Sequence, residues 1–467
     1  MSSASLDQRF LPFQQMMQEQ GLPGIVIDTF RHNYAQLLAG ATGLIPEADI
    51  TPVTQLPDAE AFGEELEAVG QEALRHAAVI KLNGGLGTSM GLERAKSLIR
   101  VKQDLSFLDI IARQALSQGT PLILMDSFAT RDDSLAVLGK YPELDGHGLG
   151  LDFLQHKVPK VDQRDLGPVH WPVAPQLEWA PPGHGDIYTA LVTSGMLPAL
   201  LAADYRYAFI SNSDNLGAVL DPRLLGHLVA EGMPFLMEVT DRTQSDRKGG
   251  HLALSRSGQL ILRESAQCPE QDRGSFEDTA RHRFFNTNNL WLDLRALDRT
   301  LQRCNNVLGL SLIRNSKTVD PRDEHSTPVY QLETAMGSAI SIFSGARAVR
   351  VPRSRFAPVK TTNDLLLVRS DVYSMTRDFR LVPDEGAATA SPVVDLDRRF
   401  YRLIDDFEAR FHAGVPSLRA CTALKVTGDI HFGAGIAIRG RVSLCNHGTR
   451  PVHLSAGSVI DADQSWD

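Results

Sequence analysis

The stretch KLNGGLGTSMG, from Lys81 to Gly91, constrains the fold of this chain more than any other feature, because it holds four glycines in eleven residues. It directly follows the apolar run HAAVI, so we expect a strand that ends in a loop whose main chain closely approaches another group. The pattern G-x-G-x-x-x-G is one residue too long for the dinucleotide fingerprint, and the GKS/T ending of a Walker loop is missing. By itself the loop is compatible with a phosphate or nucleotide cradle, or with a turn that binds nothing.

The chain beyond this loop alternates short apolar runs with helical segments, which is typical of an α/β sheet with crossover helices. We predict strands for AAVIKL, PLILMD, YAFIS and FLMEV, and a helix for SFLDIIARQALS with Ser106 as its N-cap and Asp109 at the third helical position. The stretch GGHLALSRSGQLILRES is predicted to form a hairpin, which would make part of the sheet antiparallel. We therefore expect a mixed sheet in the central domain, residues 76–395.

The two ends of the chain follow other patterns. Residues 1–75 are predicted to form a helical N-terminal region, with an apolar stripe in LDQRFLPFQQMMQEQG and a linker in IPEADITPVTQLPD. Residues 396–467 begin with LDRRFYRLIDDFEARF, predicted as one helix, and continue with apolar residues at every sixth position, in the columns Val426, Phe432, Ile438, Leu444 and Ile430, Ile436, Val442. This repeat indicates a short parallel β-helix, and an irregular stack of hairpins is the alternative.

Charge and length exclude some classes of protein. With 467 residues the chain is long enough for two or three domains. The formal net charge of −9, without an extended Lys/Arg run, argues against a general nucleic-acid binder and against binding to an anionic membrane. The N-terminus MSSASLDQRF lacks the apolar core of a signal peptide, so we expect a cytoplasmic protein.

Three further segments combine glycines or turn residues with groups that suit phosphate chemistry. Lys96 follows the glycine loop and could neutralise a triphosphate, although it could also be a solvated surface lysine. In PPGHGDIYTAL, His184 would lie beside an anion at the start of a helix, although loop histidines are usually structural. In SNSDNLGA, Asp214 between Asn212 and Asn215 suits Mg²⁺ that shares phosphate oxygens, although Asx-rich turns are often only turns.

Two later stretches are more polar than a scaffold requires. FFNTNNLWLDL carries Asn286 and Asn288, whose amides suit sugar hydroxyls. VPRSRFAPVKTTNDLLLV brings Arg353, Arg355 and Lys360 together, and this predicts a cationic patch in an acidic protein.

These segments, in this order, resemble the eukaryotic-type UTP–glucose-1-phosphate uridylyltransferase family, also called the UDP-glucose pyrophosphorylases. The matching motifs are KLNGGLGTSMG with AKS, PPGHGD, SNSDNLGA, MEVTDRTQSDRKGG, FNTNNLW, VYQLETAMGSAI and VPRSRFAPVKTTNDLLLV. The resemblance extends from about Val79 to about Val459. It implies a mixed-sheet, Rossmann-like nucleotidyltransferase domain of the glycosyltransferase A-like type, with a helical N-terminal part and a C-terminal left-handed parallel β-helix.

The resemblance also implies roles for individual residues. Lys96 and Lys360 are the implied catalytic residues, and Asp214 is the implied Mg²⁺ ligand. The implied nucleotide contacts are Leu82, Asn83, Gly84, Gly85, Gln155, Gly183, Asn212 and Asp214. The implied contacts to the sugar phosphate are Gly85, His184, Glu264, Asn286 and Asn288. The chain departs from the family where Arg94-Ala95-Lys96-Ser97 replaces GPKS and where Ser213 replaces an apolar residue.

The implied reaction is attack by a phosphate oxygen of glucose 1-phosphate on the α-phosphorus of UTP, which forms UDP-glucose and releases pyrophosphate. A phosphomonoester is largely ionised at neutral pH, so catalysis would consist of positioning and charge neutralisation, with no general base. Two alternatives remain: the same reaction with N-acetylglucosamine or galactose 1-phosphate, and a non-catalytic UDP-sugar-binding protein. The C-terminal β-helix is a candidate surface for a homo-oligomer.

Overall fold

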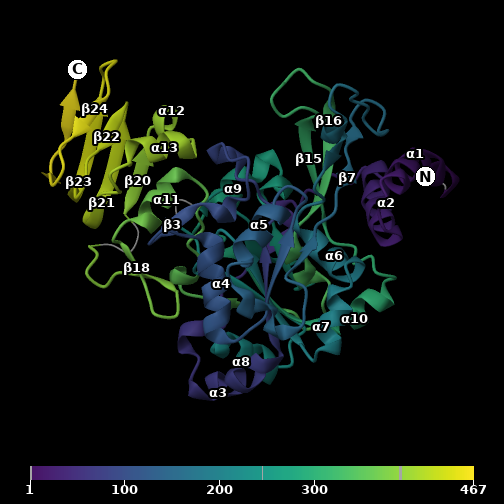
Figure 1. The fold of residues 1–467 in the computed structure, drawn as a ribbon. Helices are drawn as coiled ribbons and strands as arrows, with labels where there is room; N and C mark the ends of the chain where they lie inside the picture. The colour runs from purple at the N-terminus through teal and green to yellow at the C-terminus, as the bar shows by residue number, and fades with distance from the viewer. Residues whose placement is uncertain (1–2, 244–245, 389–391) are drawn as a thin grey trace.

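The computed structural model describes residues 3–243, 246–388 and 392–467, and its centre is a ten-stranded mixed sheet (Figure 1). The strand order is β1-β12-β14-β10-β2-β5-β6, while β11 joins β14 to β17, and β13 joins β12. The pairs β10–β2, β2–β5, β5–β6 and β11–β17 are parallel and the other pairs are antiparallel, which confirms the predicted mixed sheet. The strands are β1 (Ile50–Pro52), β2 (Ala77–Leu82), β5 (Leu122–Asp126), β6 (Asp152–Leu154), β10 (Tyr207–Asn212), β11 (Phe235–Asp241), β12 (His251–Ser255), β13 (Leu260–Arg263), β14 (Phe284–Asp293) and β17 (Arg347–Arg350).

The parallel strands β2, β5 and β10 are buried along nearly their whole length, as expected for strands covered on both faces. The predicted helix after the glycine loop is α4 (Phe107–Gln118), and Ser106 and Asp109 form the predicted capping box. The predicted hairpin is β12–β13. The helices around the sheet are α3 (Glu64–Ala73), α5 (Arg131–Leu138), α6 (Ile187–Thr193), α7 (Met196–Ala202), α8 (Pro222–Ala230), α9 (Arg273–Glu277), α10 (Leu294–Arg303) and α11 (Thr362–Arg369).

The helices of the N-terminal region pack against two different parts of the molecule. Helices α1 (Ser3–Glu19) and α2 (Gly24–Leu38) pack on each other through the predicted stripe, in which Phe10, Phe13 and Met17 are buried. This pair covers the small sheet of β8 (Val161–Asp162), β15 (Leu312–Thr318) and β16 (Pro328–Thr334), at the right of Figure 1. Helix α3 instead lies against α8 below the main sheet.

The predicted linker before α3 is partly wrong, because its residues Ile50–Pro52 form β1, an edge strand paired with β12. Ile50 and Val53 are buried there, so the apolar residues of this segment favour pairing over a free linker. The contact of α3 with α8 depends on two glycines: a Cβ at Gly70 would lie 1.7 Å from the carbonyl oxygen of Pro222, and one at Gly226 would lie 1.8 Å from that of Leu66. Only glycine allows the two main chains to come so close.

The C-terminal strands pair in parallel, as the six-residue repeat requires. Val426 pairs with Leu444, eighteen residues on, and this offset equals three six-residue steps. Hairpins would give antiparallel pairs, so the alternative of a hairpin stack does not fit the described strands. They are β20 (Val393–Leu396), β21 (Ser417–Thr427), β22 (Ile430–Phe432), β23 (Ala437–Asn446), β24 (Val452–Leu454), β25 (Val459–Ile460) and β26 (Gln464–Trp466).

The single helix predicted for LDRRFYRLIDDFEARF is wrong, because the segment forms two short helices, α12 (Arg398–Tyr401) and α13 (Ile404–Arg410). Leu403 between them is extended, with φ −84° and ψ 147°. Its side chain packs on the glycine loop, where a Cβ at Gly91 would lie 2.9 Å from Cδ2 of Leu403. This tertiary contact outweighs the helical propensity of the segment.

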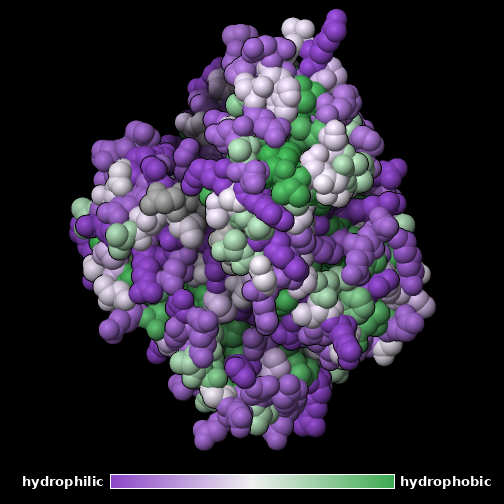
Figure 2. All heavy atoms as spheres, turned by 90° about the vertical axis from the view of Figure 1, so that its left-hand side faces the viewer, coloured by the Kyte–Doolittle hydropathy of each residue, from purple (hydrophilic) through white to green (hydrophobic). Residues whose placement is uncertain are grey.

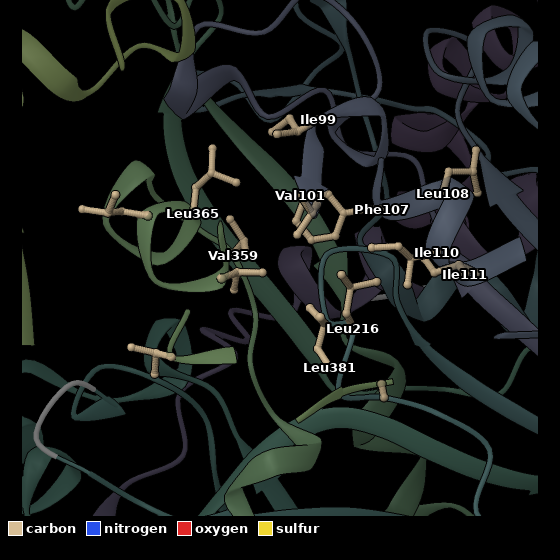
Figure 3. Packing of buried hydrophobic residues seen from close by; sticks show 14 of the residues in the cluster. Ile99, Val101, Phe107, Leu108, Ile110, Ile111, Leu216, Val359, Leu365 and Leu381 are labelled. Atoms are coloured by element: carbon tan, nitrogen blue, oxygen red, sulfur yellow. The ribbon is translucent and has the colours of Figure 1, made fainter. Parts of the chain in front are cut away.

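One hydrophobic cluster runs from the main sheet into the C-terminal strands. It includes Phe107 of α4, Val359 before α11, and Leu424 and Ile438 of the C-terminal strands. Figure 3 shows how Ile99, Phe107, Leu216 and Val359 meet in this cluster. The loops that carry Lys96, Asp214 and Lys360 are therefore anchored in the same core.

The face on which the C-terminal strands lie is mostly hydrophilic, with small separate hydrophobic patches (Figure 2). In the described part of the chain no single helix is long and apolar enough to span a membrane. Only the bent helix pair 184–193 and 196–202 would be long and apolar enough when its two members are taken together.

Candidate active site

The site forms where the parallel strands β2 and β10 end side by side. Leu82 and Asn212 are partners in the register of the two strands, and the N–H of Ser213 donates to the carbonyl oxygen of Leu82 at 3.1 Å. The glycine loop and the SNSDN loop therefore leave the sheet at the same edge. Ligands of open α/β sheets bind at such carboxyl ends.

In the glycine loop, Gly84 is in close contact with a neighbouring side chain, whereas Gly85 borders open space. A Cβ at Gly84 would lie 2.7 Å from Oε1 of Gln155, so these two predicted nucleotide contacts touch each other. A Cβ at Gly85 would meet no protein atom within 4 Å, so the protein itself does not require glycine there. The N–H of Lys96 donates to the carbonyl oxygen of Gly85 at 3.1 Å. The loop thus folds back on Lys96 and leaves open space at Gly85 for a ligand.

Lys96 and Asp214 form an ion pair in which Nζ lies 2.7 Å from Oδ2, and each side chain is 16% exposed. The other carboxylate oxygen, Oδ1 of Asp214, is buried and has no hydrogen-bond partner. An unpartnered carboxylate oxygen at a phosphate site suits a divalent cation that takes its other ligands from phosphate and water. Among the described residues no group of three or more His, Cys, Asp or Glu could hold a metal ion.

Asn83 points away from the open side of the loop. Its Nδ2 donates to Oδ1 of Asp126 at 2.7 Å and to Oγ of Ser134 at 2.8 Å, and its side chain is buried. Asp126 is fully buried at the end of β5, and its Oδ2 has no partner. Burial raises the pKa of Asp126 to about 6, although Asn83, Thr130 and Ser134 all donate to it. The side chain of Asn83 thus ties the glycine loop to β5 and α5.

The GHGD segment is held by the end of β16. A Cβ at Gly183, whose φ is +81°, would lie 2.4 Å from the carbonyl oxygen of Thr334, and one at Gly185 would lie 2.3 Å from its Oγ1. The N–H of Met336 donates to Nδ1 of His184 at 3.0 Å. Burial, and then the charge of Lys360, lower the pKa of His184 to about 4. The neutral ring therefore presents Nε2–H as a hydrogen-bond donor, not as a cation.

Asp186 of the same segment binds the residue that follows Gln155. Its carboxylate accepts from the N–H of His156 at 2.7 Å and contacts Nδ1 of the same residue at 3.0 Å. This fixes the chain that follows Gln155. The sequence offered Asp186 as part of a motif but gave no hint of its partner.

The predicted sugar-binding residues lie at a bulge in β14. Pairing with β11 skips two residues there, because Glu238 pairs with Asn289 and Val239 with Asn286. Asn288 takes a left-handed conformation with φ +57°, and Nδ2 of Asn286 donates to its Oδ1 at 2.9 Å. Bulges commonly redirect side chains next to active sites.

Glu264 lies nearby, and its carboxylate fills the space beside Gly250, where a Cβ would lie 2.5 Å from Oε2. Burial raises the pKa of Glu264, although Asn286 and the charge of Lys360 act in the opposite direction. Glu264, Asn286 and Lys360 are thus close enough to influence one another.

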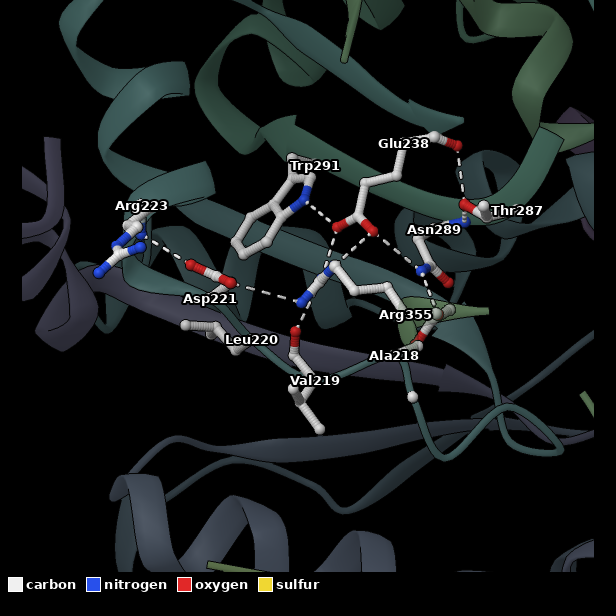
Figure 4. A network of polar contacts seen from close by, with 12 residues as sticks. Ala218, Val219, Leu220, Asp221, Arg223, Glu238, Thr287, Asn289, Trp291 and Arg355 are labelled. Atoms are coloured by element: carbon white, nitrogen blue, oxygen red, sulfur yellow. Dashed lines mark hydrogen bonds and ion pairs between the residues drawn. The ribbon is translucent and has the colours of Figure 1, made fainter. Parts of the chain in front are cut away.

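The predicted cationic patch is largely neutralised. Arg353 forms a bidentate pair with Asp246 at 2.7 and 3.0 Å. Arg355 is buried and pairs with Glu238 at 2.6 Å, within the network of Figure 4. Of the three cations only Lys360 is left without an ion pair in the described structure. The patch is therefore a single available cation beside two structural arginines.

The network of Figure 4 surrounds Glu238, which lies wholly inside the protein. Its carboxylate accepts from Nε1 of Trp291 at 2.8 Å, from Nδ2 of Asn289 at 3.0 Å and from Arg355. Arg355 in turn donates to the carbonyl oxygen of Val219 at 2.9 Å. This network joins β11 and β14 to the segment of Arg355 and to Val219, which follows the SNSDN loop.

Asn215 connects the loop of Asp214 to the loop of Lys360. Its Nδ2 donates to the carbonyl oxygen of Arg355, and its Oδ1 accepts from the N–H of Ala357, each at 3.0 Å. The N–H of Val359 donates to the carbonyl oxygen of Asp214 at 3.1 Å. A short antiparallel bridge therefore joins the two loops.

Lys81 lies beneath this bridge and was not foreseen as a site residue. It is fully buried, and its Nζ donates to Oγ of Ser211 at 2.8 Å and to the carbonyl oxygen of Ala218 at 2.7 Å. Burial, followed by the charge of Arg355, lowers the pKa of Lys81 to about 7. A lysine inside the strand AAVIKL was the available signal, because a charged residue is rarely placed in a buried strand without partners.

Comparison with known proteins gives one consistent result. The family model described as UTP--glucose-1-phosphate uridylyltransferase matches residues 27–439. A curated protein of that name from Solanum tuberosum is 38% identical over 427 residues, which cover 89% of this chain and 84% of the relative. One from Saccharomyces cerevisiae is 39% identical over 397 residues, with 83% and 77% covered.

Solved structures show the same likeness over nearly the whole chain. A mutant of the UDP-glucose pyrophosphorylase from Leishmania major, in complex with UDP-glucose, has a TM-score of 0.91 at 42% identity and covers 98% of this chain and 99% of that one. A protein from Trypanosoma brucei described as UDP-glucose phosphorylase has a TM-score of 0.88 at 45% identity, with 98% and 100% covered.

Proposed function

Because the chain belongs to the UTP–glucose-1-phosphate uridylyltransferase family, we propose that it converts UTP and glucose 1-phosphate into UDP-glucose and pyrophosphate. The observation that carries this function is the pair of Lys96 and Asp214 beside the open glycine loop, with Lys360 tied to the same site through Asn215. Two cations and one carboxylate with a free oxygen are the groups that phosphoryl transfer requires.

The nucleotide lies, in this proposal, along the edge formed by β2 and β10. Gln155, resting on Gly84, and the main chain at Gly183 would read the uracil. The open space at Gly85 would admit the phosphates, and Asn212 would lie beside the ribose or phosphates. The residues Leu82 and Asn83 would contribute main-chain contacts, since the side chain of Asn83 is engaged with Asp126.

We assign the metal ligand to Asp214 and the metal to Mg²⁺. Oδ1 of Asp214 has no hydrogen-bond partner among the described residues, and this suits a hard cation that keeps water and phosphate ligands. When bound, the cation would neutralise phosphate charge. Lys96, whose Nζ is held by Oδ2 of the same carboxylate, would bind the triphosphate.

Lys360 would stabilise the charge that grows on the α-phosphoryl group during transfer. It is exposed and has no ion pair in the described structure, so its charge is free to act on substrate. His184, neutral and with Nε2–H available, would donate to the phosphate of glucose 1-phosphate. Glu264, Asn286 and Asn288 would bind the glucose hydroxyls.

A panel assay tests the proposal. Pyrophosphate release is measured with UTP, Mg²⁺ and separately glucose, galactose and N-acetylglucosamine 1-phosphate. Fast pyrophosphate release with glucose 1-phosphate, and not with the other two sugar phosphates, supports the proposed function. Faster release with another sugar 1-phosphate would identify that compound as the substrate. Binding of UDP-glucose without any release would favour a non-catalytic UDP-sugar-binding protein.

For the remaining parts of the chain we propose the division 1–75, 76–395 and 396–467, with a left-handed β-helix in the last part. The parallel pairing of β21 and β23, at an offset of eighteen residues from Ala423 to Thr427, supports a coil of three short sides. A cytoplasmic location and a homo-oligomer built through the C-terminal strands stay predictions, which fractionation and sedimentation of the full chain would test.

A further inference from the structure

A pocket of about 270 Å³ lies between the glycine loop and the start of the C-terminal segment. Its wall combines Ser89 of the glycine loop, Lys360, and the two arginines Arg398 and Arg402. The pocket shares Lys360 with the proposed active site, so a ligand in it would reach the reacting phosphates.

The local fold explains why both arginines face this pocket. Helix α12 begins at Asp397, whose side chain accepts from the N–H of Arg399, and ends before the extended Leu403 that packs on Gly91. Arg398 and Arg402 are four residues apart and so lie on one face of this turn. Arg399 is turned away and pairs with Asp397 at 2.7 Å.

The charges in the pocket are not balanced by the protein. In the described part of the chain, Lys360, Arg398 and Arg402 form no ion pair with a carboxylate, although the chain has a formal net charge of −9. The hydroxyl-bearing residues Thr361 and Thr362 also line the wall. Three unpaired cations with hydroxyl donors form a site for a small polyanion.

We propose that this pocket, the diphosphate pocket, binds the pyrophosphate leaving group, as the β- and γ-phosphates of UTP before transfer and as the free product after it. The inference rests on the proposed function. When the bond between the α-phosphorus and the bridging oxygen breaks, that oxygen keeps the electron pair, and the leaving group gains negative charge. Arg398 and Arg402 would offset this charge as binding residues from the C-terminal segment.

The reverse reaction tests the pocket, because pyrophosphate is then a substrate with its own KM. UTP formation is measured with Arg398→Ala, Arg402→Ala and the double variant, with pyrophosphate and UDP-glucose varied separately. We expect the KM for pyrophosphate to rise about tenfold for each single variant, as for the loss of a charged hydrogen bond. The KM for UDP-glucose should stay within about twofold, because the arginines lie beyond the α-phosphate.

Arg399→Ala is the matched control, since Arg399 lies between the two arginines but outside the pocket wall. It should change neither KM. An unchanged KM for pyrophosphate in the double variant, or an equal rise for UDP-glucose, would overturn the proposal. Arg402→Lys keeps the charge and should recover part of the loss. A KM for pyrophosphate in Arg402→Lys equal to that in Arg402→Ala would argue against a charge effect.

Calorimetry with pyrophosphate separates this inference from the proposed function. A wild-type chain that formed no UTP would refute the function. Pyrophosphate binding by the wild type and its loss in the double variant would still support the pocket. Equal binding by both would refute it. Circular dichroism of each variant confirms that the exposed substitutions leave the fold intact.

Discussion

The N–H of Val359 donates to the carbonyl oxygen of Asp214, so the loop of the proposed catalytic lysine begins one hydrogen bond from the proposed metal ligand. Asn215 reinforces this link through the main chain of Arg355 and Ala357. These hydrogen bonds therefore fix the main chain of the two loops relative to each other.

Asn215→Ala should lower kcat by about tenfold or more, because misplacing a catalytic group by a fraction of an ångström is costly. Asn215 acts through Lys360 in this view. In a double-variant cycle, Asn215→Ala should therefore have little further effect in the Lys360→Ala background. Full additivity of the two losses in kcat would show that Asn215 acts elsewhere.

Lys360→Ala should reduce kcat by roughly 10²-fold or more, the usual cost of losing an electrostatic contact to a transition state. Steady-state assays with saturating UTP and glucose 1-phosphate measure this directly. Lys317→Ala, an exposed lysine on β15, serves as the control and should keep wild-type kcat. Wild-type turnover in Lys360→Ala would remove the residue from the mechanism.

Asp214→Asn should shift the Mg²⁺ activation curve to higher concentration and lower the maximum rate, because the amide loses both the metal-binding charge and the ion pair with Lys96. The measurement is rate against Mg²⁺ concentration at fixed UTP. Asp461→Asn, an exposed substitution near the C-terminus, should leave the curve unchanged. If the curve of Asp214→Asn matched the wild type, the metal ligand would have to be sought elsewhere.

Asp126 should make the free energy of unfolding depend on pH. Its pKa is about 6 in the folded chain and near the usual 3.8 when unfolded, so the folded state binds more protons between these values. Stability contributed by this group is therefore greatest below pH 3.8 and falls as the pH rises to 6, by on the order of 3 kcal/mol at most.

Asp126→Asn removes this titration. Urea unfolding at pH 4.5 and 7.0 should show that the variant loses less stability than the wild type over this interval. Asp461→Asn again provides the control. Identical pH dependence in Asp126→Asn and wild type would show that Asp126 is not the titrating group.

The sequence predicted the strands of the central sheet well where apolar runs end in polar loops. The strands AAVIKL and YAFIS are parallel neighbours, and Lys96 pairs with Asp214 beyond their ends. The six-residue columns likewise correspond to parallel pairs such as Val426 with Leu444. In each case the signal is local, because periodicity and turn residues are contained in one short segment.

Pairing between distant segments could not be read from the chain. Arg355 looked like part of a cationic patch, but Glu238, over a hundred residues earlier, neutralises it inside the protein. The break at Leu403 depends on Gly91, which lies even further away in the sequence. No single-segment pattern encodes such contacts, because they arise only when distant segments are brought together in the folded chain.

The hydrophobic cluster that passes from α4 through Val359 to Ile438 has a consequence for cooperativity. Elements that pack into one continuous core form a cooperative unit of unfolding. The C-terminal strands should therefore unfold together with the sheet that carries the site, in one heat-absorption peak. Truncation before β21 would expose part of the hydrophobic surface of Val359 and its neighbours. The loop of Lys360 would then become more mobile, although the truncation lies far from it in the sequence.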